Sequence, residues 1–178
     1  MNHYNKVLGQ LIFYMLISVG YSISPVEKVD VNAYLGRWYQ VIGSEFNLVF
    51  MSNGSCITAD YGLGNNNITV LNSEFYHDKL QQITGYAKGT NPNVQGELAV
   101  YLHGVPVAGQ YYIYELGDII NDQYSYSIVS DQYFITLFVL VRNVTFYHEY
   151  LESKLEYAIS EYGFKYVYDV EQTNCTYV

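Results

Sequence analysis

The chain has 178 residues, half of them hydrophobic, and carries a formal net charge of −9 at pH 7. A chain of this length forms one domain with a single core. Its acidic balance argues against binding to nucleic acid, whose phosphates require a basic surface, and against binding to anionic membranes.

The N-terminal segment has the pattern of a secretory signal peptide. Lys6 precedes an apolar run that ends at Gly20, and Gly20 and Ser22 supply the small residues of a cleavage site. The run has about 14 residues, fewer than the roughly 20 that span a bilayer. We predict a signal peptide at 1–22 and a single domain over 23–178. An uncleaved membrane anchor is the alternative.

Eight short segments rich in Tyr, Val, Ile and Thr follow, and turn residues separate them. This pattern is typical of an all-β sandwich or barrel. We expect strands at 37–43, 55–63, 68–76, 80–88, 97–102, 110–116, 124–130 and 133–141. Successive strands joined by short turns predict an eight-stranded antiparallel up-and-down β-barrel. Closing the barrel removes the sheet edges that would otherwise pair with other chains.

The periodicity changes near the C-terminus. Over 146–162, apolar side chains recur at helical spacing, at Tyr147, Leu151, Leu155, Ala158 and Tyr162. Thr145 is the expected N-cap, and Gly163 follows the last turn as a C′ residue does. We therefore predict one amphipathic α-helix packed on the outside of the barrel, followed by a short extended piece at 166–170.

Two motifs about 100 residues apart carry a family resemblance. The segment Gly36-Arg37-Trp38 resembles the Gly-x-Trp motif that begins the first strand of lipocalins. Arg142, which follows Phe138-Val-Leu-Val, resembles the arginine that ends their eighth strand. The chain thus resembles the lipocalin family, and most of all the branch that contains apolipoprotein D and the bacterial lipocalins.

The motif residues have a physical role that does not depend on the family. We expect the indole of Trp38 to close one end of the barrel and the guanidinium of Arg142 to lie across that ring while donating to carbonyls at the strand ends. Gly36 lets the preceding backbone pass close to this end. A second lipocalin motif, Thr-Asp-Tyr after the sixth strand, is degenerate here, and Asp118 is its nearest equivalent.

The chain has two cysteines, Cys56 and Cys175. In a secretory compartment such a pair usually forms a disulfide, and the resemblance implies this pairing, which ties the tail to the second strand. Two free thiols are the alternative. Four sequons predict N-glycosylation in the same compartment, at Asn53, Asn67, Asn143 and Asn174.

The resemblance implies a ligand cavity inside the barrel, with contacts at Tyr61, Asn72 and Phe138. Alternation along the eighth strand, counted from Arg142, sends Leu140, Phe138, Thr136 and Phe134 inward. By alternation along the second strand, Ala59 lies on the same face as Tyr61. Along the third strand, Val70 and Glu74 lie on the same face as Asn72, and the resemblance implies that both faces point inward. The predicted ligand-binding residues are therefore Tyr61, Asn72, Phe138, Phe134, Val70 and Ala59.

Such a wall is apolar and aromatic with a few fixed polar groups, and an eight-stranded barrel has room for one small ligand. A lipid, fatty acid, sterol, retinoid or pigment fits this description. A filled core without a cavity is the alternative. The first connecting loop, 44–54, contains several apolar residues. They either cap the ligand, contact a membrane or receptor, or pack beneath the loop. We expect a monomer or a weak dimer.

The sequence contains no pattern that predicts catalysis. Its four histidines lack metal-ligand spacing, and no glycine-rich phosphate loop precedes a helix. We therefore predict a secreted carrier of a small hydrophobic ligand, with no metal and no cofactor. One alternative is a protein-interaction module that acts through its loops. The other is an isomerase or redox enzyme that uses a free Cys56 or the acids Asp60 and Glu74.

Overall fold

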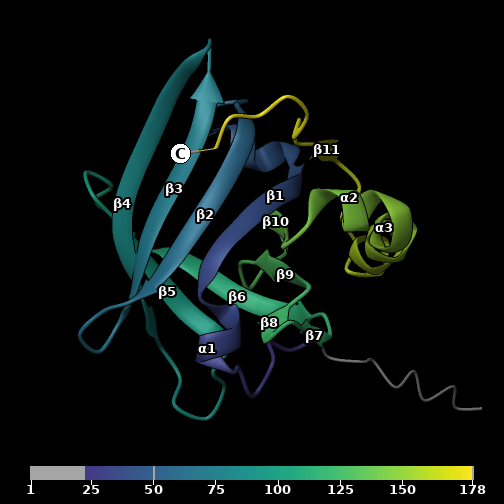
Figure 1. Cartoon of the computed structure of the whole chain (residues 1–178). Coiled ribbons are helices and arrows are strands. Elements are labelled where there is room, and N and C mark those ends of the chain that lie inside the picture. The colour runs from purple at the N-terminus through teal and green to yellow at the C-terminus, as the bar shows by residue number, and fades with distance from the viewer. Residues whose placement is uncertain (1–22, 50, 178) are drawn as a thin grey trace, which may run out of the picture.

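The computed structural model describes residues 23–49 and 51–177, so the predicted signal peptide lies outside the described residues. Its main sheet has nine strands in the order β10-β9-β6-β5-β4-β3-β2-β1-β11, and all neighbours are antiparallel. A further pairing between β10 and β1 closes the sheet into a barrel (Figure 1). The predicted eight-stranded up-and-down barrel is confirmed.

The eight strands of the barrel follow one another along the chain: β1 (Gly36–Ser44), β2 (Ser55–Leu63), β3 (Ile68–Tyr76), β4 (Lys79–Gly89), β5 (Glu97–Leu102), β6 (Gly109–Leu116), β9 (Tyr126–Ser130) and β10 (Leu137–Val141). Two short strands, β7 (Ile119–Ile120) and β8 (Gln123–Tyr124), form a separate hairpin between β6 and β9. The ninth strand of the sheet, β11 (Val167–Asp169), lies within the extended piece predicted at 166–170 and pairs with the second half of β1.

The two ends of the barrel differ in what covers them. Figure 1 shows α1 (Val31–Tyr34) at one end and the β3–β4 hairpin at the other. The first turn of α1 is capped by the carboxylate of Asp30, which accepts hydrogen bonds from the backbone N–H groups of Asn32 and Ala33. We call the end that carries α1 the closed end. The opposite end, next to the 3₁₀ turn η1 (Glu45–Val49), is the open end.

The predicted helix packs on the outside of the barrel but begins earlier than expected (Figure 1). It consists of α2 (Val144–Phe146), a π-helical turn η2 (Tyr147–Leu151) and α3 (Glu152–Glu161). The N-cap is Asn143, whose Oδ1 accepts a hydrogen bond from Phe146 N at 2.9 Å, so the expectation of Thr145 was wrong. Gly163 has φ +88°, as a C′ residue requires.

Two apolar layers result from strand alternation. Residues on the inner face of the strands, among them Trp38, Val70 and Ile113, pack inside the barrel. Residues on the outer face of β1, β9 and β10 pack against the helix through Tyr147, Leu155 and Ile159. No helix in the described part of the chain is long and apolar enough to cross a membrane.

Cys56 and Cys175 form a disulfide, with their Cα atoms 5.6 Å apart. The bond ties the C-terminal tail to β2, so the alternative of two free thiols was wrong. The cross-link closes a loop with a sequence separation of 119 residues. In the chain-entropy model such a loop contributes roughly 4 to 5 kcal/mol to stability, as an upper value.

Candidate ligand-binding site

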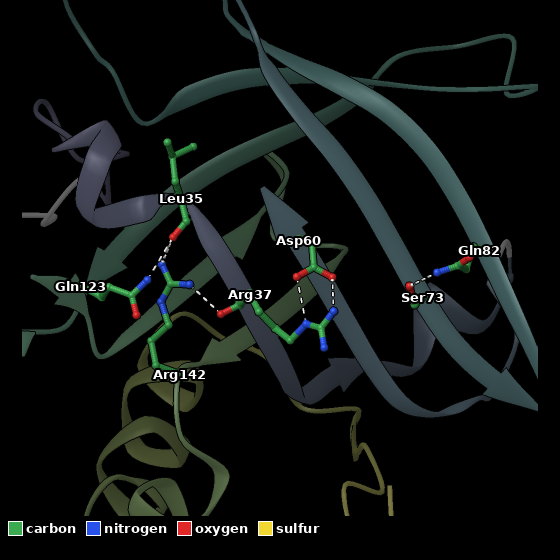
Figure 2. A network of polar contacts seen from close by, with 7 residues as sticks. All are labelled: Leu35, Arg37, Asp60, Ser73, Gln82, Gln123 and Arg142. Atoms are coloured by element: carbon green, nitrogen blue, oxygen red, sulfur yellow. Dashed lines mark hydrogen bonds and ion pairs between the residues drawn. The ribbon is translucent and has the colours of Figure 1, made fainter. Parts of the chain in front are cut away.

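Trp38 and Arg142 close one end of the barrel as the motif pair predicts. Trp38 is fully buried, and its indole N–H donates to Tyr34 O at 2.9 Å. The guanidinium carbon of Arg142 lies 3.7 Å from the centre of the Trp38 ring. Its nitrogens donate, over 2.6 to 3.1 Å, to the backbone carbonyls of Ala33, Tyr34, Leu35 and Arg37. Figure 2 shows the hydrogen bonds of Arg142 with Leu35 and Arg37.

Burial of Arg142 lowers its pKa from the usual value to about 10, which still leaves the side chain charged at neutral pH. Gly36 has φ +93°, and a Cβ there would lie 3.4 Å from the guanidinium and 3.2 Å from Gln123 Nε2. Both the backbone conformation and the close approach therefore require glycine.

A cavity of about 970 Å³ occupies the barrel interior toward the open end. The alternative of a filled core was therefore wrong. Five of the six residues predicted to contact a ligand lie on its wall: Ala59, Tyr61, Val70, Asn72 and Phe138. They come from β2, β3 and β10, three strands that lie on both sides of β1.

The inward placement predicted for Phe134 was wrong. The strand expected at 133–141 begins only at Leu137, because the preceding residues form a turn around Asp131. The carboxylate of Asp131 accepts hydrogen bonds from the backbone N–H groups of Tyr133, Ile135 and Thr136. Phe134 takes a left-handed φ of 55°, and its ring packs instead against Tyr114, Tyr162 and Phe164.

Several polar residues on the cavity wall were absent from the predicted set. Ser73 and Gln82 are joined by a hydrogen bond of 3.1 Å across β3 and β4 (Figure 2). Glu74 accepts a hydrogen bond from Ser52 through Oε1, while its buried Oε2 has no partner among the described residues. The parity of Asn72 does place Glu74 on the inner face. Nothing in the sequence indicated that Ser52, in the first loop, reaches the same wall.

At its inner end the cavity meets Tyr61 and Tyr111, which with Tyr34 form a hydrogen-bonded group that we call the tyrosine layer. Tyr111 Oη lies 2.8 Å from Tyr34 Oη and 3.0 Å from Tyr61 Oη, and Tyr34 also shares a hydrogen bond with Ser127. Burial raises the pKa of Tyr34 to about 12 and raises those of Tyr61 and Tyr111 above the usual value. The layer therefore presents neutral hydroxyl groups at physiological pH.

The enzymatic alternative requires a free Cys56 or the acids Asp60 and Glu74, of which Glu74 lines the cavity. Asp60 forms a bidentate ion pair with Arg37, at 2.9 Å for both contacts (Figure 2). It does not line the cavity. Cys56 is oxidised, so it offers no thiol nucleophile. Residues 23–49 and 51–177 contain no group of three His, Cys, Asp or Glu side chains placed to hold a metal ion.

The first loop covers part of the open end. Met51 and Ser52 line the cavity, and Asn47 is buried, with Nδ2 donating to Leu137 O at 2.7 Å. Phe46 and Val49 remain exposed on η1. The loop is thus anchored through Asn47 and contributes Met51 and Ser52 to the cavity wall, while capping of a ligand and contact with a membrane or receptor stay predictions.

The four predicted glycosylation sites differ in exposure. Three of them are exposed, at Asn53, Asn143 and Asn174. Asn67, in the β2–β3 turn, is half-buried. Glycosylation at these positions stays a prediction.

Known proteins resemble this chain in sequence and in fold. A family model described as a lipocalin-like domain matches residues 29–172. The outer membrane lipoprotein Blc of Vibrio cholerae is 32% identical over 146 residues, which are 80% of this chain and 81% of that protein. Apolipoprotein D of Rattus norvegicus is 37% identical over 105 residues, and this match spans 58% of the chain but only 51% of that relative.

Among solved structures, lobster apocrustacyanin A1 superposes with a TM-score of 0.61 at 18% identity, covering 82% of this chain and 81% of that one. This likeness concerns the fold alone. The family model, by contrast, extends from the segment before α1 to the tail beside Cys175, and it includes Gly36, Trp38 and Arg142. The chain therefore belongs to the lipocalin family.

Proposed function

We propose that this protein is a secreted lipocalin that binds and transports one small hydrophobic ligand in the barrel cavity, without catalysis. The observation that carries the proposal is the cavity of about 970 Å³ with Ala59, Val70 and Phe138 on its wall. This volume lies within the range of about 300 to 1,000 Å³ typical of small-molecule sites. Burial of apolar ligand surface contributes about 25 cal/mol per Å² before ordering costs.

The polar groups narrow the class of ligand. Glu74, Asp131 and His103 line the cavity, whereas no Lys or Arg of the described residues does. A carboxylate ligand would meet two acids on a wall without a permanently charged lysine or arginine to compensate its charge. Neutral hydroxyls of the tyrosine layer offer both donors and acceptors at the inner end. The cavity therefore favours an uncharged ligand with an apolar body and a hydroxyl or carbonyl end, such as a sterol, a retinoid or a neutral lipid.

Secretion is supported by two features of the chain. The first 22 residues have the composition of a signal peptide, and the Cys56–Cys175 disulfide is of the kind that persists in oxidising compartments. Expression of the full chain in a secreting eukaryotic host tests this. We expect protein in the medium that begins at Ile23 and loses mass when N-glycans are removed enzymatically. Retention in the membrane fraction with residues 1–22 still attached would contradict secretion.

Native mass spectrometry of the protein purified from that medium tests ligand binding. We expect a bound molecule that solvent extraction identifies as an uncharged lipid or pigment, or the uptake of one equivalent of retinol or cholesterol by the empty protein. A barrel that stays empty through such a series would contradict the proposal. It would favour a protein-interaction role through the exposed apolar side chains of the open end, Phe46, Val49 and Val107.

A further inference from the structure

We propose that the main cavity, the space of about 970 Å³ inside the barrel, contains a polar subsite for a ligand hydroxyl group at the end away from the tyrosine layer. The ligand of this cavity then carries a polar group at each end of an apolar body. The subsite rests on the proposed function, because it serves the same ligand. It narrows the class of ligand from molecules with one polar end to molecules with two.

Two polar side chains on the cavity wall have a buried atom without a hydrogen-bond partner among the described residues. They are Gln40, through Nε2, and Glu74, through Oε2. Gln40 is only 3% exposed. It lies on the same face of β1 as Trp38 and pairs with Leu140 of β10, which also lines the cavity. Because a buried polar atom without a partner is costly, these two atoms point to a group that the described chain does not supply.

Gln40 and Glu74 belong to the same level of the barrel wall. Gln172, in the C-terminal tail, donates hydrogen bonds to the backbone carbonyls of Gln40 and Ile57, at 2.8 and 2.9 Å, and so joins β1 to β2 at this level. In β3, Glu74 lies opposite the irregular part of β2 that contains Ile57. The amide of Gln40 and the carboxylate of Glu74 therefore reach the cavity from neighbouring parts of one wall.

The hydroxyl of Tyr168, in β11, is a third buried group without a hydrogen-bond partner. Tyr168 pairs with Gly43 of β1, and a Cβ on Gly43 would lie 2.8 to 2.9 Å from atoms of the phenol. Since Gly43 also pairs with Phe138 of the cavity wall, the phenol crosses the inner face of β1. Burial raises the pKa of Tyr168, and the charge of Glu74 raises it further. The amide of Gln40 acts in the opposite direction, although the two groups do not reach hydrogen-bond geometry.

A hydroxyl group fits these atoms better than a charged group does. It can donate a hydrogen bond to Oε2 of Glu74 and accept one from Nε2 of Gln40 at the same time. An ammonium group has donors only and offers nothing to the Gln40 amide, and a carboxylate is repelled by Glu74. The subsite therefore favours an uncharged ligand, as the tyrosine layer does.

The subsite and the tyrosine layer lie far enough apart to bind opposite ends of one molecule. Tyr61 pairs with Val70 in β3, and Glu74 lies four residues further along the same strand. At about 3.3 Å per residue, the two levels are separated by about 13 Å. Ala59 and Ile83 line the cavity at the level between them. An apolar body with hydroxyl groups at both ends matches this arrangement.

Fluorescence titration with retinol and 4-hydroxyretinol tests the subsite, because the second compound adds one hydroxyl at the far end of the same body. We expect the wild type to bind 4-hydroxyretinol roughly tenfold more tightly or better, since retinol leaves the buried groups unpaired. An apolar wall would instead disfavour the added hydroxyl. Equal affinities, or tighter binding of retinol, would overturn the subsite and leave the proposed function standing. Failure of both compounds to bind would contradict both.

Leucine variants assign the preference to its residues. Gln40→Leu and Glu74→Leu each remove one unpartnered group, and each should reduce the preference for 4-hydroxyretinol to about threefold or less without weakening retinol binding. Gln132→Leu makes the same change at an exposed turn position off the cavity wall and should keep the full preference. Circular dichroism checks each fold, and the wild-type ratio needs no variant. A preference that survives both cavity variants, or that Gln132→Leu removes, would overturn the proposal.

Discussion

Two phenylalanines on neighbouring stretches of chain have different surroundings. Phe138 lies in β10 and on the wall of the main cavity, opposite Gly43 of β1 in the barrel closure. Phe134 lies four residues earlier and packs outside the cavity, with its ring centre 4.6 Å from that of Tyr114. The pair therefore provides an internal comparison between a residue that contacts the cavity and one that does not.

We predict that Phe138→Ala weakens binding of a neutral ligand such as retinol about tenfold or more. Burying a phenylalanine against a ligand is worth about 1.5 to 3 kcal/mol, and about 1.4 kcal/mol corresponds to a factor of ten. Phe134→Ala should leave the affinity unchanged while it lowers thermal stability. Fluorescence titration measures the affinity. An equal loss of affinity in the two variants would contradict a ligand contact that is specific to Phe138.

Arg142 contributes to stability through geometry as well as charge. We predict that Arg142→Lys lowers the free energy of unfolding by about 2 to 4 kcal/mol, because an ammonium group cannot both lie across Trp38 and reach four carbonyls. Arg37→Lys alters a partly exposed ion pair and should cost less than about 1 kcal/mol. Urea unfolding measures both. Similar losses would show that charge alone matters at Arg142.

At the scale of elements, strand alternation predicts the site well wherever the strand is regular. The expected and observed bounds of β2 agree, Ser55 to Leu63, and the inward set Ala59 and Tyr61 lies on the cavity wall. Alternation fails at Phe134 because a side chain, Asp131, organises the backbone there. Composition and periodicity do not show which carboxylate accepts a hydrogen bond from which backbone N–H group. The same reason explains why Asn143, and not Thr145, begins the helix.

The Asp131 turn makes stability depend on pH. Burial opposes ionisation of Asp131, but hydrogen bonds from Thr136, Tyr133 and Ile135 outweigh it and hold its pKa below the usual value. Because the folded-state pKa is depressed, the stabilisation is present above the unfolded pKa of about 3.9 and is lost as the pH falls through the folded value.

We therefore predict that Asp131→Asn lowers the free energy of unfolding at pH 7 by about 1 to 2 kcal/mol, the range for charged hydrogen bonds at a partly exposed site. The difference from the wild type should shrink below pH 4. Urea unfolding between pH 2.5 and 7 measures it, with Asp122→Asn, an exposed turn residue, as the control. A difference that stays constant over this range would contradict the assignment.

At the scale of the whole molecule, the tyrosine layer divides the barrel interior. A cavity of about 970 Å³ lies on one side of it, and a second cavity of about 640 Å³, with Tyr34 on its wall, lies on the other. The larger cavity carries Glu74, His103 and Asp131 on its wall. The motifs Gly36, Trp38 and Arg142 predict the barrel from the sequence. The division of the interior into two cavities does not follow from these motifs. It depends on hydrogen bonds between the hydroxyl groups of Tyr34 in α1, Tyr61 in β2 and Tyr111 in β6.

The disulfide acts on the whole molecule by joining the tail to β2. We predict that the double variant Cys56→Ser, Cys175→Ser loses up to roughly 4 kcal/mol of unfolding free energy, since it frees a loop of more than 100 residues. Neither cysteine lines the main cavity, so the affinity for retinol should be unchanged. Urea unfolding and fluorescence titration measure the two quantities. Unchanged stability, or lost affinity in a folded variant, would contradict this.

Trp38 also has a spectroscopic consequence. It is the only tryptophan in a chain with 22 tyrosines, it is fully buried, and its ring centre lies 5.1 Å from that of Tyr34. All indole emission therefore originates beside the tyrosine layer, where excitation energy absorbed by neighbouring phenol rings is collected. The protein thus contains its own optical reporter at the boundary between the two cavities, and no label is needed to follow events there.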